Sequence, residues 1–292
     1  MLAKTVTGHH IMIKEIKKKR NNDIDSLNLE DNCLSIQLSL DGFSFCVYNK
    51  IQDKIGAFAI YEFENSTGSP FKQLTCIQEL FSREELLQLN YKSVFVTHFN
   101  NLVTQVPQPL FNKNNLVPYL QYTVKVLEND FIAYDELNNS EIINVYIPFV
   151  NVNNFLLDTY DTFVYTHSST VLIENLLNQY KNKEGTFCFV NVTGNHFEIV
   201  VIKNKKLELF NFFSFTTKED FIYYILFTAE QLNLNPEEFE LILMGDIEKE
   251  SELYAIVYQY IRKVSFYTSN EDTFQLNETA SHAYFTLLNQ FK

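Results

Sequence analysis

The chain has 292 residues, of which 46% are hydrophobic and 20% are charged, and its formal net charge is −13. Such a composition supports one large or two medium domains with a substantial core, and it excludes a disordered chain. The acidic charge disfavours nucleic acid and anionic membranes as main partners. No run of about 18 apolar residues occurs, so no transmembrane segment is predicted. The four cysteines form no CxxC pair, which indicates a reduced, cytoplasmic protein.

Residues 1–31 are predicted to form an N-terminal extension. It carries the basic run KEIKKKR, Lys14–Arg20, in an otherwise acidic protein. Such charge runs are usually solvated, and chain ends are usually poorly ordered. We therefore expect a partly mobile terminus here, with a basic amphipathic contact as the alternative.

The first predicted domain, residues 32–183, begins with three runs in which apolar and polar residues alternate, as in strands with one buried face. These runs are Leu34–Leu40, Phe43–Val47 and Ile55–Phe63. Asp41-Gly42 is a hairpin signal, because glycine tolerates the positive φ that tight hairpin turns require. A capping-box pattern at Ser82 and Glu85 predicts a helix start, and Tyr91–Thr97 predicts a further strand.

The second predicted domain, residues 184–292, repeats this order. Its three β-rich runs are Phe187–Val192, Phe197–Ile202 and Leu207–Phe213. A capping-box pattern at Thr216 and Glu219 opens the next helix, and Phe239–Met244 is the next strand. Aligning Gly42 with Gly194 brings the two meanders into register. Three antiparallel strands, a helix and a fourth strand therefore occur twice, which favours duplication.

An insertion is predicted in the first domain at about residues 107–149. It is expected to contain a helix over Asn114–Val126 and strands over Phe131–Tyr134 and Ile142–Ile147. After the insertion, a strand over Phe163–Thr166 precedes a helix over Ser169–Tyr180. The leucines at positions 172, 176 and 177 form the apolar stripe of that helix, which we expect to cross into the second half.

A β-β-β-α-β unit that occurs twice resembles the ATPase superfamily of actin, sugar kinases and heat-shock protein 70. Within it, the chain looks most like the reduced actin-like proteins of type IV pilus and type II secretion systems. The phrasing FVNV-G-FE-V…L-F-N-F is similar to an uncharacterised Bacteroidetes family, a domain of unknown function. The resemblance implies an α/β fold of two duplicated ribonuclease-H-like domains. Each is a mixed sheet with a three-stranded antiparallel meander plus helices, and the superfamily binds ATP between them.

The resemblance also implies a set of nucleotide-binding positions. In the superfamily a strand-end Asp positions Mg²⁺, and glycines let backbone N–H groups approach phosphate. The matching positions are Ser39, Asp41 and Gly42 in the first loop, Asn191, Thr193 and Gly194 in the second, and Gly245 and Asp246 in the adenosine motif. Asn191 replaces an acid, and each motif has lost glycine, so we interpret the cleft as degenerate. No catalytic residue, metal ligand or cofactor is predicted, and ATP with Mg²⁺ is the alternative.

Because the motifs lack the acid and glycines of the superfamily, the predicted function is a non-catalytic actin-like scaffold or adaptor of the bacterial cytoplasm. It is expected to bind a protein partner or to form a homodimer. The alternative is an ATP-binding phosphotransferase or ATPase with an unorthodox active site, to be tested first at Asp41, Asp246 and His196. A ribonuclease-H-like nuclease is disfavoured by the charge and by the lack of a carboxylate cluster for two metals. The aromatic cluster that begins at Phe210 is expected to pack in the core, with a partner surface as the alternative.

Overall fold

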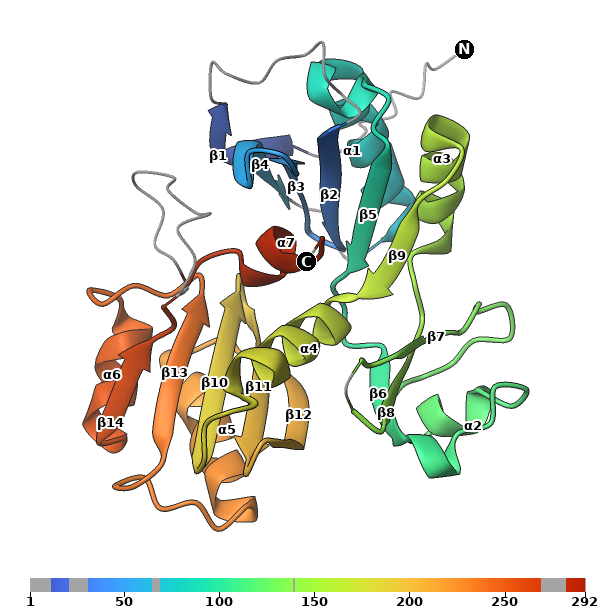
Figure 1. Cartoon of the computed structure of the whole chain (residues 1–292). Coiled ribbons are helices and arrows are strands. Elements are labelled where there is room, and N and C mark those ends of the chain that lie inside the picture. The colour runs from blue at the N-terminus through green and yellow to red at the C-terminus, as the bar shows by residue number, and fades with distance from the viewer. Residues whose placement is uncertain (1–11, 21–30, 65–68, 139, 269–281, 292) are drawn as a thin grey trace, which may run out of the picture. The chain divides into compact units, whose positions relative to one another are not determined.

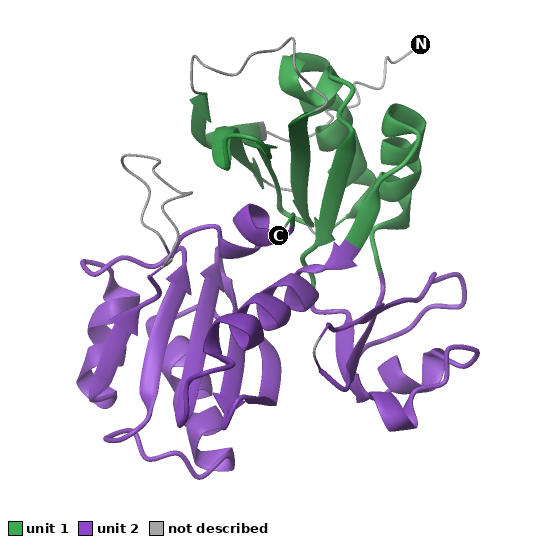
Figure 2. Cartoon of the chain, viewed as in Figure 1, with its two compact units in different colours: residues 1–100, 148–165, 291 green, residues 101–147, 166–290, 292 purple. Residues whose placement is uncertain are grey.

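The computed structural model describes residues 12–20, 31–64, 69–138, 140–268 and 282–291. The chain divides into two compact units (Figure 2). The first unit comprises residues 1–100, 148–165 and 291, and the second comprises residues 101–147, 166–290 and 292. Each unit is built around its own mixed sheet.

The first unit contains a six-stranded sheet in the order β1-β4-β3-β2-β5-β9 (Figure 1). Its strands are β1 (Met12–Arg20), β2 (Asn32–Ser39), β3 (Gly42–Asn49), β4 (Lys54–Glu64), β5 (Ser93–His98) and β9 (Val164–His167). The antiparallel β2–β3–β4 meander was predicted from its alternating pattern. Helices α1 (Pro70–Arg83) and α3 (Val150–Tyr160) and the 3-10 helix η2 (Glu85–Gln88) complete this unit. The core between sheet and helices includes Leu34, Phe43, Ile77 and Leu156.

The expected mobile terminus is wrong over residues 12–20, because these residues form strand β1. The strand pairs antiparallel with β4 along the edge of the sheet. Ile13 packs against the core, and the Lys17 Nζ lies 6.0 Å from the centroid of the Phe58 ring. Lysine side chains can cover apolar surface with their stems while the ammonium stays in water, so a lysine-rich strand is stable at an edge. The rest of the predicted extension, residues 1–11 and 21–30, lies outside the described residues.

The second unit contains a five-stranded sheet in the order β12-β11-β10-β13-β14. Its strands are β10 (Thr186–Thr193), β11 (His196–Lys203), β12 (Lys206–Ser214), β13 (Glu240–Gly245) and β14 (Lys263–Phe266). Helices α5 (Lys218–Gln231) and α6 (Glu252–Tyr260) cover one face through residues such as Phe221 and Val257. Helices α4 (Ser168–Tyr180) and α7 (Phe285–Asn289) cover the other through Leu172 and Phe285.

The two sheets have the same plan. Both sheets have the third, second and first strands of the meander side by side, in that order. The strand that follows the first helix pairs next to the first meander strand, and the strand that follows the second helix comes after it. The sequence order β2-β3-β4-α1-β5-α3-β9-α4 matches β10-β11-β12-α5-β13-α6-β14-α7 element by element. The predicted α/β class and the duplicated units are therefore confirmed. Strand β1 is an addition to this plan in the first sheet.

A three-stranded antiparallel sheet in the order β6-β8-β7 is inserted between β5 and α3. Its strands are β6 (Val103–Pro107), β7 (Ala133–Glu136) and β8 (Ile142–Tyr146), with the 3-10 helix η3 (Gln108–Leu110) after β6. Strand β6 was not predicted, so the insertion begins earlier than expected. The helix expected over residues 114–126 is wrong in length, because α2 covers only Val117–Leu120.

The predicted boundary between the domains differs from the boundary of the compact units. Helix α4 was expected in the first domain, but its apolar stripe packs against Phe189 and Met244 in the second sheet. The inserted sheet belongs to the second unit as well. Helix α4 follows β9 in sequence, yet it belongs to the second unit, because its apolar side chains pack against the second sheet.

Both predicted capping boxes need correction. Ser82 lies inside α1, where its hydroxyl donates to the Glu79 carbonyl at 2.7 Å. In the second half the box begins one residue later than expected. Thr217 Oγ1 accepts from the Asp220 N–H at 3.1 Å, and Asp220 Oδ2 accepts from the Thr217 N–H at 3.0 Å. These bonds satisfy N–H groups that the first turn of a helix leaves unpaired.

Replacement of Thr217 by alanine is expected to lower the free energy of unfolding by about 1 kcal/mol, because it removes the cap hydroxyl. Thr216→Ala is the matched control, since Thr216 contributes its backbone N–H to Asp220, and alanine keeps that group. Urea unfolding followed by circular dichroism measures both variants. Equal losses in the two variants would contradict the assignment of Thr217 as the cap.

Candidate functional site

The first predicted loop is the hairpin between β2 and β3 in the first unit. Ser39 pairs with Gly42, so the two-residue turn is Leu40-Asp41 rather than Asp41-Gly42. The Ser39 hydroxyl donates to Asp41 Oδ1 at 2.8 Å. Gly42 does not have a positive φ; instead, a Cβ there would lie 2.9 Å from the Tyr61 carbonyl oxygen. Gly42 is therefore required for close approach to β4, and the reason given by the turn pattern is wrong.

A buried glutamine holds the end of β2 beneath this loop. Gln73 of α1 is fully buried, and its Nε2 donates to the Ser39 carbonyl at 2.6 Å. Its Oε1 has no hydrogen-bond partner among the described residues. Gln73 could not be predicted as a buried residue, because a single polar residue in an amphipathic helix is expected on the solvent face.

The second loop and the adenosine motif lie side by side in the second unit. Val192 at the end of β10 is in register with Gly245 at the end of the parallel strand β13. Gly194 has φ +55°, and its N–H donates to Asp246 Oδ2 at 3.3 Å. The Asp246 N–H in turn donates to the Val192 carbonyl at 2.8 Å. The fold thus brings Asn191, Thr193, Gly194, Gly245 and Asp246 to one end of the sheet.

The closest approach in this group is at Gly245. Its φ is +79°, and a Cβ at this position would lie 2.0 Å from the Val192 carbonyl oxygen and 2.9 Å from Asn191 Oδ1. No side chain fits at that separation, so glycine is required by packing as well as by backbone conformation. The single glycine of this motif therefore has a structural role in joining β13 to β10.

Glu198 is a buried carboxylate that the sequence analysis did not single out. It lies opposite Asn191 in the β10–β11 ladder and is fully buried. Asn191 Nδ2 donates to Glu198 Oε2 at 2.9 Å, whereas Oε1 has no hydrogen-bond partner among the described residues. Burial raises the pKa of Glu198 to about 7, against the smaller opposing effects of Asn191 and Ser168. The only sequence signal is one acid at a core-facing position of HFEIVVIK.

These contacts do not fit a magnesium triphosphate at the second loop. The Gly194 N–H, which a phosphate would need as a donor, already donates to the Asp246 carboxylate. The amide of Asn191, at the position of the expected acid, already donates to Glu198. A phosphate would have to displace the Asp246 carboxylate and would meet its charge, and like charges at short range repel.

A second buried carboxylate links the inserted sheet to the start of α4. Asp135 Oδ2 on β7 accepts from the His167 N–H at 2.8 Å and from Thr170 Oγ1 at 2.6 Å. Its Oδ1 accepts from the Tyr146 hydroxyl at 3.0 Å. Burial raises the pKa of Asp135 to about 6, although these hydrogen bonds oppose the shift. This network satisfies groups at the N-terminus of α4 and fixes the insertion to it.

Three histidines at strand ends differ in environment. His98 is fully buried, and its Nδ1 accepts from the Phe149 N–H at 3.1 Å. His167 is fully buried and caps α4, where its Nδ1 accepts from the Ser169 N–H at 3.1 Å. His196 Nδ1 lies 2.9 Å from the Ser214 hydroxyl on the neighbouring strand. His98 and His167 therefore have structural partners in the core.

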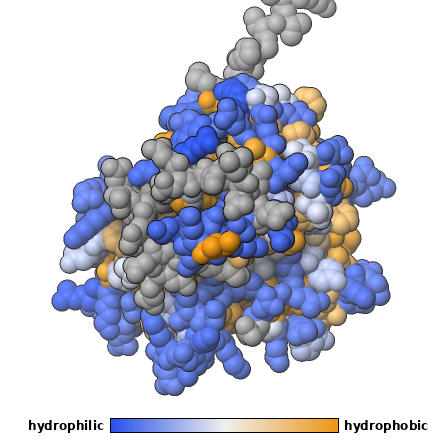
Figure 3. Space-filling model, turned by 45° about the horizontal axis from the view of Figure 1, so that its top comes forward, coloured by the Kyte–Doolittle hydropathy of each residue, from blue (hydrophilic) through white to orange (hydrophobic). Residues whose placement is uncertain are grey.

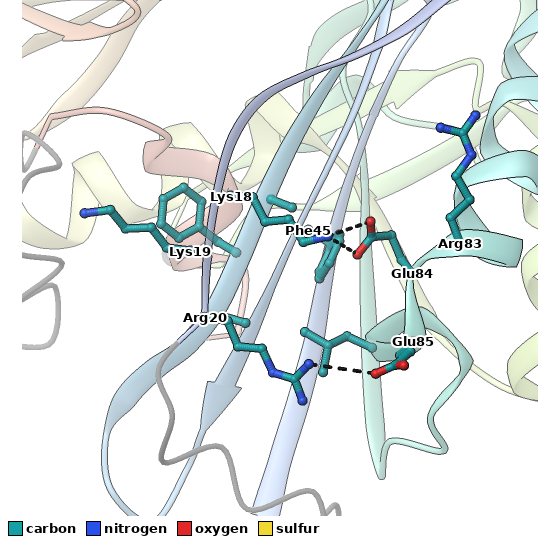
Figure 4. Close-up of a pocket in the computed structure, with 11 residues that line it drawn as sticks. Lys18, Lys19, Arg20, Phe45, Arg83, Glu84 and Glu85 are labelled. Atoms are coloured by element: carbon teal, nitrogen blue, oxygen red, sulfur yellow. Dashed lines mark hydrogen bonds and ion pairs between the residues drawn. The ribbon is translucent and has the colours of Figure 1, made fainter.

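A cavity of about 150 Å³ lies beside β1 and the start of η2 in the first unit (Figure 4). Two of its basic residues, Lys18 and Arg20, are paired with acids of the same unit. Lys18 Nζ donates to both carboxylate oxygens of Glu84 at 2.7 Å, and Arg20 Nη1 lies 3.9 Å from Glu85 Oε2. The pairing offsets positive charge that an anion would require, so this cavity is a weak candidate for phosphate binding.

The expectation that the aromatic cluster of the second unit packs in the core holds in full only at Phe221, because most of its other rings are half-buried. Phe221 is fully buried, and Phe213 stacks on Tyr224 with 4.7 Å between ring centroids. Tyr223 and Phe227 on α5 are 59% and 43% exposed and stack on each other at 6.0 Å. On the face drawn in Figure 3, apolar residues form small separate groups within a mostly hydrophilic surface.

Within the described part of the chain, no cluster of three or more His, Cys, Asp and Glu side chains has an arrangement that would hold a metal ion. No helix in the same ranges has the length and apolar character needed to cross a membrane. All four cysteines are buried and free, as predicted.

Comparisons with known proteins agree with the observed fold. A Bacteroides thetaiotaomicron protein with actin-like ATPase fold and unknown function superposes with a TM-score of 0.74 at 24% identity, over 84% of this chain and 93% of that chain. The PilM-PilN type IV pilus biogenesis complex gives a TM-score of 0.55 at 12% identity, over 88% and 97% of the respective chains. No curated protein matches the sequence.

The structural likeness shows an actin-like ATPase fold, as the duplicated units implied. A family model described as "Protein of unknown function (DUF3822)" matches residues 21–264, which is most of the sequence. The chain belongs to the DUF3822 family.

Proposed function

We propose that this chain is a non-catalytic actin-like scaffold or adaptor that acts through protein–protein contacts in the bacterial cytoplasm. The observation that carries the proposal is the hydrogen bond from the Gly194 N–H to Asp246, because the resemblance would have this N–H face a phosphate and here it donates to a carboxylate of the chain itself. The neutral Asn191 supports it further, because an amide does not supply the charge that holds Mg²⁺ against triphosphate. The pilus complex among the structural neighbours supports an association role by likeness of fold.

Thermal unfolding with and without Mg-ATP or Mg-ADP tests the proposal. A ligand at a hundred times its Kd would add about 2.7 kcal/mol to the free energy of unfolding. For this chain we expect no shift of Tm with either nucleotide and no release of phosphate. A Tm increase together with hydrolysis that Asp41→Ala abolishes would overturn the scaffold proposal.

The alternative function, an ATP-binding phosphotransferase or ATPase, is favoured by one observation. Glu198 is buried on β11 opposite Asn191 of the second loop, and its pKa of about 7 is suited to a general base at neutral pH. If the chain hydrolyses ATP, Glu198→Gln is expected to abolish hydrolysis, because glutamine accepts no proton. The loss of hydrolysis in that variant, with unchanged circular dichroism, would identify this alternative.

A further inference from the structure

The outer edge of β12 differs from the corresponding edge in the first unit. In the first unit β4 holds the same place in the duplicated plan, and β1 pairs along its outer side. Six of the eleven residues of β4 are buried. In the second unit β12 pairs on one side with β11, and no strand within the described ranges pairs on its other side. None of the nine residues of β12 is buried.

The backbone of β12 presents hydrogen-bonding groups along this outer edge. The Phe215 N–H donates to the Asn195 carbonyl, so it points toward β11. N–H directions alternate along a strand, and β12 follows β11 in unbroken register from Leu209 to Ser214. The N–H groups of Phe210 and Ser214 therefore point away from β11. An edge of this kind is a template for another strand.

The side chains of β12 lack the usual protection of an edge. Strand β1 carries five Lys and Arg residues among its nine. Strand β12, KLELFNFFS, has one Lys and one Glu, and both lie in its first three residues. From Leu209 to Phe213 it offers half-buried Leu and Phe side chains, with Asn211 alone exposed among them. Natural edge strands use charge to prevent pairing, and this segment has none.

We propose that β12 pairs antiparallel with β12 of a second copy of this chain, which joins the two five-stranded sheets into one. This inference rests on the proposed function, and it names the partner of that scaffold. Two copies related by a twofold axis at Phe210 align residues whose numbers sum to 420. Within the unbroken stretch that begins at Leu209, Leu209 then lies opposite the Asn211 of the second copy, and the Phe210 residues lie opposite each other. Apolar and aromatic cross-strand pairs stabilise a sheet.

The charges of β12 are compatible with this twofold register. Lys206 and Glu208 lie beyond the register shift that follows Leu209, and the segment of the second copy that they approach, up to Ser214, carries no charge, so no like charges meet. The strand carries zero net charge, because Lys206 and Glu208 offset each other. The formal charge of −13 on the whole chain therefore does not concentrate repulsion at this edge. A charged or acidic partner strand would gain no complementary charge between Leu209 and Ser214, which favours a second copy.

Analytical ultracentrifugation of the full chain, over a range of protein concentration, tests the proposal. We expect the wild type to form a concentration-dependent dimer. Asn211→Lys places a charge at the centre of the paired strands, so this variant is expected to be monomeric at every concentration, with a Tm near that of the wild type. Asn211→Ser is the matched control and is expected to dimerise as the wild type does.

Two results would overturn the dimer. One is a wild type that stays monomeric at all concentrations, and the other is an Asn211→Lys variant that dimerises as strongly as Asn211→Ser. The nucleotide experiment separates this inference from the proposed function. If the chain is monomeric and does not hydrolyse nucleotide, the dimer is rejected and the scaffold proposal stands. If it dimerises and shows turnover that depends on Asp41, the scaffold proposal is rejected and the dimer stands.

Discussion

Replacement of Gly245 by alanine is expected to lower the free energy of unfolding by more than about 3 kcal/mol. Two effects act together. The φ of +79° is unfavourable for a residue with a Cβ, which costs about 1–2 kcal/mol. The added Cβ would also lie 2.0 Å from the Val192 carbonyl oxygen, which is backbone and cannot rotate away. Strand β13 would have to separate from β10 at its end, where the Asp246 N–H donates to that same carbonyl.

Gly194→Ala is the matched control for this prediction. Gly194 has a φ of +55°, but a Cβ there would have no neighbour within 4 Å. The variant therefore isolates the backbone cost, and we expect a loss of about 1 kcal/mol. Urea unfolding followed by circular dichroism gives both values. Similar losses at the two positions would show that the approach of Gly245 to Val192 is not the constraint that we infer.

The meander strands of the two sheets could be predicted because their local patterns are clear. Alternation marks the run beginning at Leu34 as a strand, the run beginning at Phe187 is rich in β-forming residues and is buried on both faces, and both meanders were found within one or two residues. Strand β1 could not be found in this way. Its edge position exposes most of KEIKKKR, so its stability comes from pairing with β4, which the local pattern does not report. Strand β6 is short and ends at a proline, so it offers too few alternations to detect.

The candidate site could be predicted in part, for a different reason. The resemblance assigned Asn191, Gly194, Gly245 and Asp246 to two loops, and the parallel pairing of β10 with β13 brings these loops together. Glu198 and Asp135 could not be predicted, because acids are expected on surfaces. Asp135 accepts a hydrogen bond from His167, which is distant in sequence, and Glu198 accepts one from Asn191 on the neighbouring strand. Spacing alone also did not predict that Asp246 would bond to the Gly194 N–H.

Glu198→Gln is expected to stabilise the protein at alkaline pH, and this effect should disappear as the pH falls. The folded state holds the pKa of Glu198 at about 7, above its ordinary value of 4.5. Between these values the unfolded chain releases the proton while the folded chain keeps it. The stability of the wild type therefore decreases as the pH rises through this window, and the loss is complete above pH 7.

Glutamine has the shape of the protonated acid and keeps an oxygen that accepts from Asn191, but it never ionises. We expect the variant to exceed the wild type by about 3 kcal/mol at pH 8.5 and by about 1 kcal/mol at pH 5.5. Urea unfolding at both pH values measures the difference. Asp135 is present in both proteins, so its own titration cancels. Glu208→Gln, at an exposed position on β12, is the control and should give the same difference from the wild type at both pH values. A pH-independent difference for Glu198→Gln would mean that the folded protein does not hold Glu198 protonated, and it would remove the support for a general base at this position.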